Sequence, residues 1–146
     1  MGDISKDIKS TFKSNRLKAF INLKYTANWL SSMENEYFKQ FGISPQQYNI
    51  LRILRGAGDQ MKVQIVKERM IERAPNATRL MDKLCEKDLI SRKRCEEDRR
   101  VVYVEITKDG LQLLTDIDNA PEKLNLVNNL SDEEAVQLSD LLDKIR

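Results

Sequence analysis

The chain contains no histidine. Histidine is the commonest metal ligand and the usual general base in enzymes, so a zinc sensor or a triad hydrolase is a poor interpretation. The sequence also has no glycine-rich phosphate loop and no metal-ligand cluster, and its carboxylates are scattered over expected helical surfaces. We therefore expect that the protein is not an enzyme and holds no metal and no cofactor.

Glycine, proline and cysteine are scarce, with 5, 3 and 2 residues among 146. Together with 40% hydrophobic and 33% charged residues, this composition favours a single, mostly helical domain over a β-sandwich or a disordered chain. No apolar run approaches the roughly 20 residues of a membrane span. The first 13 residues also lack the apolar core of a secretory signal. We expect a cytoplasmic protein with reduced thiols and no membrane partner.

The net charge of +2 is unevenly distributed along the chain. Residues 1–30 carry six basic and two acidic side chains, residues 62–107 carry twelve and nine, and residues 111–146 carry three and eight. A basic middle and an acidic C-terminal segment are typical of a molecule with one face for a polyanion. A solvated surface with no such partner explains the composition equally well.

A helical pattern without glycine or proline runs from about Lys9 to Phe41. Leu23, Ala27 and Leu30 share one face of this helix. Further apolar side chains are spread around its circumference, beyond what one core needs: Phe12, Leu17, Phe20, Ile21, Tyr25 and Trp29. The pattern predicts a second surface that binds a partner.

Three further helices are expected before residue 88. Ser44 and Gln47 form a capping box with Pro45 at the first helical position, and this helix is expected to end at Gly56 and Gly58. A short helix is expected over Lys62–Met70, followed by a tight turn through residues 71–74 and a helix over about Pro75–Lys87. Two short helices joined by a brief turn form a helix-turn-helix.

The last of these helices leads into a charged hairpin. Residues 89–94 are extended, and residues 101–106 alternate with the period of a β-strand. Between them lies the polar tip Cys95–Arg100. A helix followed by such a hairpin is the outline of a winged helix. Beyond the hairpin, Thr107 caps a helix over Lys108–Asp118.

The final expected helix begins at a capping box formed by Ser131 and Glu134. Its apolar residues form a stripe: Leu138, Leu141, Leu142 and Ile145. A lone helix of this length is marginal in water, so we expect the stripe to dock on another surface.

Several of these residues resemble the signature of the multiple-antibiotic-resistance-regulator (MarR) family of winged-helix transcription regulators. They are Asn76-Ala77-Thr78-Arg79, Leu84, Leu89-Ile90, Asp98-Arg99-Arg100, Thr107 and Gly110. The family usually has an acidic residue where this chain has Cys85, and a glycine where it has Asp88. The helix order also fits from about residue 8 to residue 145.

The resemblance implies a mainly α fold with a small β-wing, in a single domain over residues 1–146. Dimerisation helices would occupy about 8–41 and 119–146, and the winged helix-turn-helix about 43–107. The implied function is that of a homodimeric repressor that binds double-stranded DNA sequence-specifically at a pseudo-palindromic operator. A small-molecule ligand would relieve the repression. The alternative interpretation is a winged-helix module that binds other proteins and binds DNA weakly or not at all.

The predicted DNA-binding residues lie on the second helix of the helix-turn-helix and on the wing. On the helix they are Asn76, Thr78, Arg79 and Lys83, because Asn pairs with adenine, Arg with guanine, and Thr with a thymine methyl group or a phosphate. On the wing the resemblance implies that Asp98 braces the tip through an ion pair, while Arg94, Arg99 and Arg100 meet DNA. A solvated turn, in which acids merely neutralise the arginines, remains the alternative.

The resemblance also implies a small aromatic or anionic effector, bound between the dimer layer and the winged helix. Possible contacts are Trp29, Tyr25, Arg16 and Tyr48, although aromatic residues at helical spacing more often belong to a core, and no ligand-binding residue is assigned. Cys85 and Cys95 lie on the DNA-reading elements, where oxidation could break contacts. The stronger interpretation is that each is a small apolar side chain.

Overall fold

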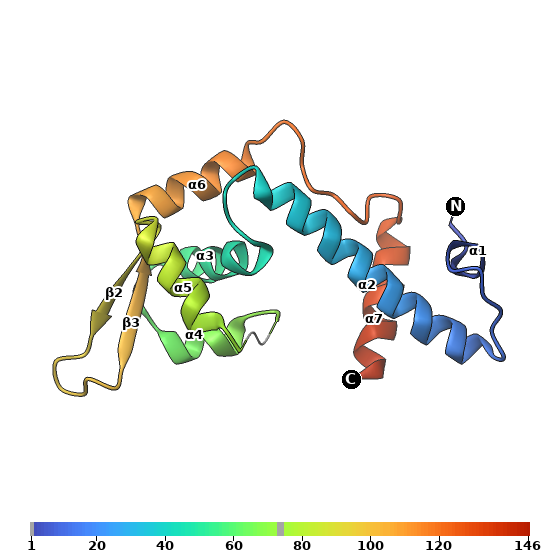
Figure 1. Cartoon of the computed structure of the whole chain (residues 1–146), viewed down its shortest axis with the longest axis horizontal. Coiled ribbons are helices and arrows are strands. Elements are labelled where there is room, and N and C mark those ends of the chain that lie inside the picture. Colours follow the sequence, from blue (N-terminus) through green and yellow to red (C-terminus); the bar gives the residue numbers. More distant parts are fainter. Residues whose placement is uncertain (1, 73–74) are drawn as a thin grey trace.

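The computed structural model describes residues 2–72 and 75–146, and within them the chain forms helices and one three-stranded sheet. The order is α1 (Ile4–Asp7), α2 (Asn15–Lys39), α3 (Pro45–Ala57), β1 (Met61–Lys62), α4 (Val63–Arg69), α5 (Ala77–Glu86), β2 (Ile90–Arg94), β3 (Val102–Ile106), α6 (Lys108–Asp118) and α7 (Asp132–Ile145). Helices α3 to α6 gather around the sheet, and α2 leads away from them toward α1 and α7 (Figure 1). The expected mainly α fold with a small β-wing is confirmed.

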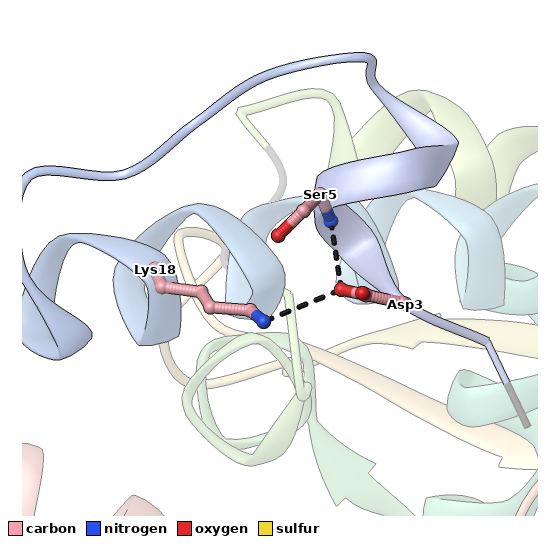
Figure 2. Close-up of polar contacts among 3 residues, drawn as sticks. All are labelled: Asp3, Ser5 and Lys18. Carbon is pink, nitrogen blue, oxygen red and sulfur yellow. Dashed lines mark hydrogen bonds and ion pairs between the residues drawn. The ribbon is translucent and has the colours of Figure 1, made fainter.

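The N-terminal helix differs from the expectation of one continuous helix starting at about residue 8. The chain instead forms the short α1, a non-helical segment in which Lys9 has a φ of 50°, and then α2 from Asn15. The hydroxyl of Ser14 caps α2 by accepting a hydrogen bond from the Leu17 N–H at 3.1 Å. The Asp3 carboxylate accepts from the Ser5 N–H and pairs with Lys18 at 3.3 Å, which holds α1 against the first turn of α2 (Figure 2).

The start of α3 follows the expected capping box. The Gln47 N–H donates to the Ser44 hydroxyl at 3.1 Å, and the Ser44 N–H donates to the Gln47 side chain at 3.0 Å. The helix was expected to end at Gly56 and Gly58. In the structure α3 continues through Gly56, and only Gly58, whose φ is 68°, ends it. A left-handed residue closes the helix, and only Gly58 adopts that conformation here.

The helix expected over Lys62–Met70 starts one residue later, and a strand precedes it. Met61 and Lys62 form β1, which pairs antiparallel with β3 so that Met61 lies opposite Val104. The sheet order is therefore β1-β3-β2. The strand expected at residues 101–106 is confirmed as β3, while residues 73 and 74 of the expected turn lie outside the described part of the chain.

Asp88, which stands where the MarR family usually has glycine, lies in the turn from α5 into β2. Its φ of 57° is the left-handed conformation that glycine adopts most easily and that aspartate tolerates. The Thr107 hydroxyl donates to the Asp88 carbonyl at 2.6 Å and also accepts from the Gly110 N–H at 3.1 Å, which caps α6 as expected. A Cβ on Gly110 would lie 2.3 Å from the Leu89 carbonyl oxygen, so this close approach of α6 requires glycine.

The core lies within the winged helix. Its largest fully buried side chains come from α3, α4, α5, β3 and α6, and they are Ile50, Leu51, Leu54, Val66, Met81, Leu84, Val104 and Leu114. Burial of such side chains contributes about 1.5–3 kcal/mol each relative to exposure. The core therefore fixes α5 and the β2–β3 hairpin on one rigid body.

Candidate nucleic-acid interface and effector cavity

Helix α5 has one buried face and one exposed face. Ala77, Met81 and Leu84 are buried in the core. The four residues predicted to read DNA are all exposed: Asn76, Thr78, Arg79 and Lys83. The helix begins at Ala77, two residues later than expected, and Asn76 occupies the N-cap position without a side-chain capping bond.

Arg92, which the sequence analysis did not single out, connects α5 to the hairpin. Its guanidinium lies 2.6 Å from the Asp82 carboxylate and donates a hydrogen bond to the Thr78 carbonyl at 3.2 Å. A guanidinium that binds two groups fixes an orientation better than a single contact does. Arg92 therefore sets the position of β2 relative to α5. In the sequence it was one of three consecutive basic residues, and nothing distinguished it from Lys93 and Arg94.

The wing consists of β2, β3 and the tip between them. The Cys95 N–H donates to the Val101 carbonyl, and the Val101 N–H donates to the Asp98 carbonyl, both at 2.9 Å. The Asp98 carboxylate accepts from the Arg100 N–H at 3.0 Å and lies 3.3 Å from Arg100 Nε. The structure thus contains an ion pair at Asp98, yet the Arg100 side chain remains 92% exposed. Arg94 and Arg99 are also exposed.

The two cysteines are half-buried. Burial is the main cause that raises the pKa of the Cys85 thiol, with Asp82 and Glu86 acting in the same direction and Arg92 in the opposite one. The thiolate is the reactive form of cysteine, so a raised pKa makes Cys85 a poor nucleophile at neutral pH. This local chemistry does not favour a redox role for Cys85.

A cavity of about 730 Å³ lies where α2 meets the winged helix. Its walls come from the C-terminal part of α2, the stretch 45–53 of α3, the segment after α4, the end of α6 and the loop beyond it. Of the residues considered as effector contacts, Tyr48 lines this cavity, whereas Trp29, Tyr25 and Arg16 are exposed and outside its lining. The charged residues of the lining are Glu34, Arg52, Glu72, Asp118 and Lys123.

Helices α2 and α7 carry many exposed apolar side chains. All residues of both helices are described, and among them only Phe38 is buried. Exposed large apolar side chains on these helices are Leu17, Phe20, Leu23, Tyr25, Trp29, Met33, Val136, Leu138, Leu141 and Ile145. We refer to these side chains as the apolar surface. The stripe expected to dock on another surface is thus unburied within one chain.

No group of three or more histidine, cysteine, aspartate or glutamate residues in 2–72 and 75–146 could hold a metal ion. Within the same residues, no helix has the length and hydropathy needed to cross a membrane.

Comparison with known proteins gives consistent matches. A family described as transcriptional regulator SarA/Rot matches residues 32–117. The HTH-type transcriptional regulator MhqR of Bacillus subtilis is 31% identical over 131 residues, which cover 88% of this chain and 90% of MhqR. A MarR transcription factor from Planctomyces limnophilus superimposes with a TM-score of 0.66 at 34% identity, covering 92% of this chain and 95% of that one. A mutant MarR from E. coli complexed with operator DNA shares the fold, with a TM-score of 0.69 at 24% identity and 99% coverage of both chains.

Proposed function

Because the chain belongs to the SarA/Rot family of transcriptional regulators and is a MarR-type winged-helix protein, we propose that it represses transcription as an operator-binding homodimer. The observation that carries this proposal is the joint exposure of α5 and the wing. Arg79 and Lys83 are exposed on α5, Arg100 is exposed on the wing, and Arg92 holds the two elements together. In this proposal α5 and the wing contact the same DNA duplex.

In this proposal α5 enters the major groove, where Arg79 binds a guanine edge and Asn76 an adenine edge. Thr78 and Lys83 contact the backbone or neighbouring bases. The wing places Arg94, Arg99 and Arg100 against the minor groove or the flanking phosphates, while Asp98 holds the tip in shape. Phosphate neutralisation supplies much of the affinity, so binding weakens steeply as salt increases.

The homodimer is proposed from the apolar surface of α2 and α7. A 14-residue helix with no buried residue, such as α7, is marginal by itself in water. A second copy would bury the apolar surface and place two α5 helices on half-sites about 34 Å apart, which requires a pseudo-palindromic operator. We accordingly assign residues 1–146 to one domain, in which α2 and α7 dimerise and residues 43–107 bind DNA.

A small-molecule effector is proposed to occupy the cavity where α2 meets the winged helix. This cavity contacts both the proposed dimerisation helix and the segment before α5. A ligand that binds better to one relative arrangement of these parts would shift the population toward it and change DNA affinity.

Selection of binders from random duplex DNA tests the regulator function. We expect enrichment of a pseudo-palindrome by the wild type, loss of specificity with Arg79→Ala, and a shallower salt dependence with Arg100→Ala, measured by fluorescence anisotropy at two salt concentrations. Lys39→Ala is the charge-matched control, because this exposed residue ends α2. If no sequence is enriched and both variants bind like wild type, the protein-interaction alternative replaces this proposal.

Sedimentation velocity tests the homodimer. Leu141→Asp places a charge in the apolar surface and should convert the dimer to a monomer, since a desolvated charge without a partner is costly. Leu111→Asp introduces the same charge at an exposed leucine on α6, outside the apolar surface, and should leave the dimer intact. A monomeric wild type would refute the dimer.

A further inference from the structure

The effector cavity contains more acidic than basic side chains. Its lining has three carboxylates, from Glu34, Glu72 and Asp118, and two cations, from Arg52 and Lys123. Asp118 pairs with Arg55 at 2.7 Å, and Arg52 lies over the Tyr48 ring at 5.8 Å from its centroid. Neither contact involves Glu34 or Glu72.

Glu34 and Glu72 lie close enough to influence each other. Burial raises the pKa of Glu34, and the negative charge of Glu72 raises it further. No ion pair between residues of the described ranges involves either carboxylate. A positively charged group placed between them would remove this repulsion and regain a favourable interaction for both.

Aromatic rings form the apolar part of the same lining. Tyr37 and Tyr48 are half-buried, and both pack on the buried Phe38, with ring centroids 5.1 Å and 4.3 Å from it. Burial is the main cause that raises the pKa of Tyr37. Aromatic faces beside carboxylates are the arrangement that binds organic ammonium groups.

We propose that the effector cavity selects an organic cation, with a positively charged nitrogen near Glu34 and Glu72 and an apolar body on the aromatic rings. The inference rests on the proposed function, in which this cavity takes an effector, and of the expected aromatic or anionic effector it keeps an apolar body and replaces the anionic charge. The two basic side chains of the lining, Arg52 and Lys123, are both exposed, and neither is a cause of the pKa shift of Glu34.

Glu72 belongs to the segment between α4 and α5, and two hydrogen bonds hold this segment. Gln46 donates a hydrogen bond to Glu72 at 2.8 Å, and the Ile71 N–H donates to the Asn49 side chain at 3.0 Å. Both bonds tie the segment before α5 to α3. A cation that pairs with Glu72 competes with the Gln46 amide for its oxygens, so cation binding changes the position of this segment and thereby of α5.

Isothermal titration calorimetry with two matched probes tests the charge selectivity. Benzyltrimethylammonium and phenylacetate both carry one benzene ring on a short arm and have opposite charges. We expect the cation to bind the wild type at least about tenfold more tightly than the anion, and Glu34→Gln to weaken the cation by about tenfold. Glu36→Gln changes an exposed carboxylate on α2 outside the lining and should bind the cation like wild type.

Anisotropy of labelled operator DNA provides the second measurement. The cation should weaken DNA binding by the wild type and by Glu36→Gln, but not by Glu34→Gln. Preferential binding of phenylacetate, or equal cation binding by wild type and Glu34→Gln, overturns the proposal. DNA binding without any probe is measured on the same samples, so failure of the regulator function is seen separately from failure of cation selectivity.

Discussion

Arg92 of β2 and Asp82 of α5 join the wing to α5, with 2.6 Å between guanidinium and carboxylate. The second nitrogen of the same guanidinium binds the Thr78 carbonyl on α5. The Arg92 side chain is 30% exposed and the Asp82 side chain 47% exposed. A pair this exposed contributes at most about 1 kcal/mol to stability, so its importance lies in geometry.

Replacing Arg92 with lysine should therefore affect DNA recognition more than folding. Lysine keeps the positive charge and can pair with Asp82, but it lacks the planar fork that also reaches the Thr78 carbonyl. We expect Arg92→Lys to weaken operator binding by about threefold to tenfold, with an unchanged salt dependence and a small change in melting temperature. Lys93→Arg, at the exposed neighbour in β2, is the control. Operator affinity equal to wild type in Arg92→Lys would mean that this contact does not position the elements.

Substitutions of two glycines by alanine should have opposite effects on stability. A Cβ at Gly110 would overlap the Leu89 carbonyl oxygen, whereas nothing lies within 4 Å of a Cβ at Gly56 inside α3. Gly110→Ala should lower the free energy of unfolding by about 1–3 kcal/mol, the usual cost of overpacking. Gly56→Ala should raise it by about 0.5–1 kcal/mol through helix propensity. Urea denaturation measures both, and a neutral Gly110→Ala would show that α6 can move away from the hairpin.

Glu34 should make stability depend on pH. Its pKa is raised above the ordinary value of 4.5, mainly by burial and further by Glu72, so the folded state holds the proton more tightly than the unfolded state. Stability therefore falls as pH rises from that ordinary value through the raised one. Glu34→Gln should increase the urea midpoint at pH 7, and the gain should vanish below pH 4.5. A gain that persists at low pH would assign the effect to packing instead of charge.

Cys85 should react slowly with thiol reagents. Burial raises its pKa, which reduces the thiolate fraction at neutral pH. In a Cys95→Ser variant, iodoacetamide should alkylate Cys85 more slowly at pH 7 than in the same chain unfolded in urea, as followed by mass spectrometry. Faster reaction in the folded protein would revive the redox interpretation at this position.

Much of the fold could be predicted because its determinants are local. The capping boxes at Ser44 and Ser131 join residues three positions apart and appear in the structure as expected. The Thr107 cap and the period-two strand after the wing tip are of the same kind. Hydrogen bonds within one helical turn and the alternation of a strand depend on neighbours in the chain, so the amino-acid sequence determines them directly.

The tertiary structure decided what depends on residues far apart. Strand β1 forms because Met61 meets Val104, and Arg92 matters because α5 brings Asp82 and Thr78 beside it. The cavity brings Glu34 of α2 and Glu72 of the segment before α5 into one lining. The sequence by itself determined the helices from Pro45 onward, the caps at Ser44, Thr107 and Ser131, and the family. Distances between separate elements arise only from packing, so the contacts of Arg92 and the acidic lining of the cavity required the folded chain.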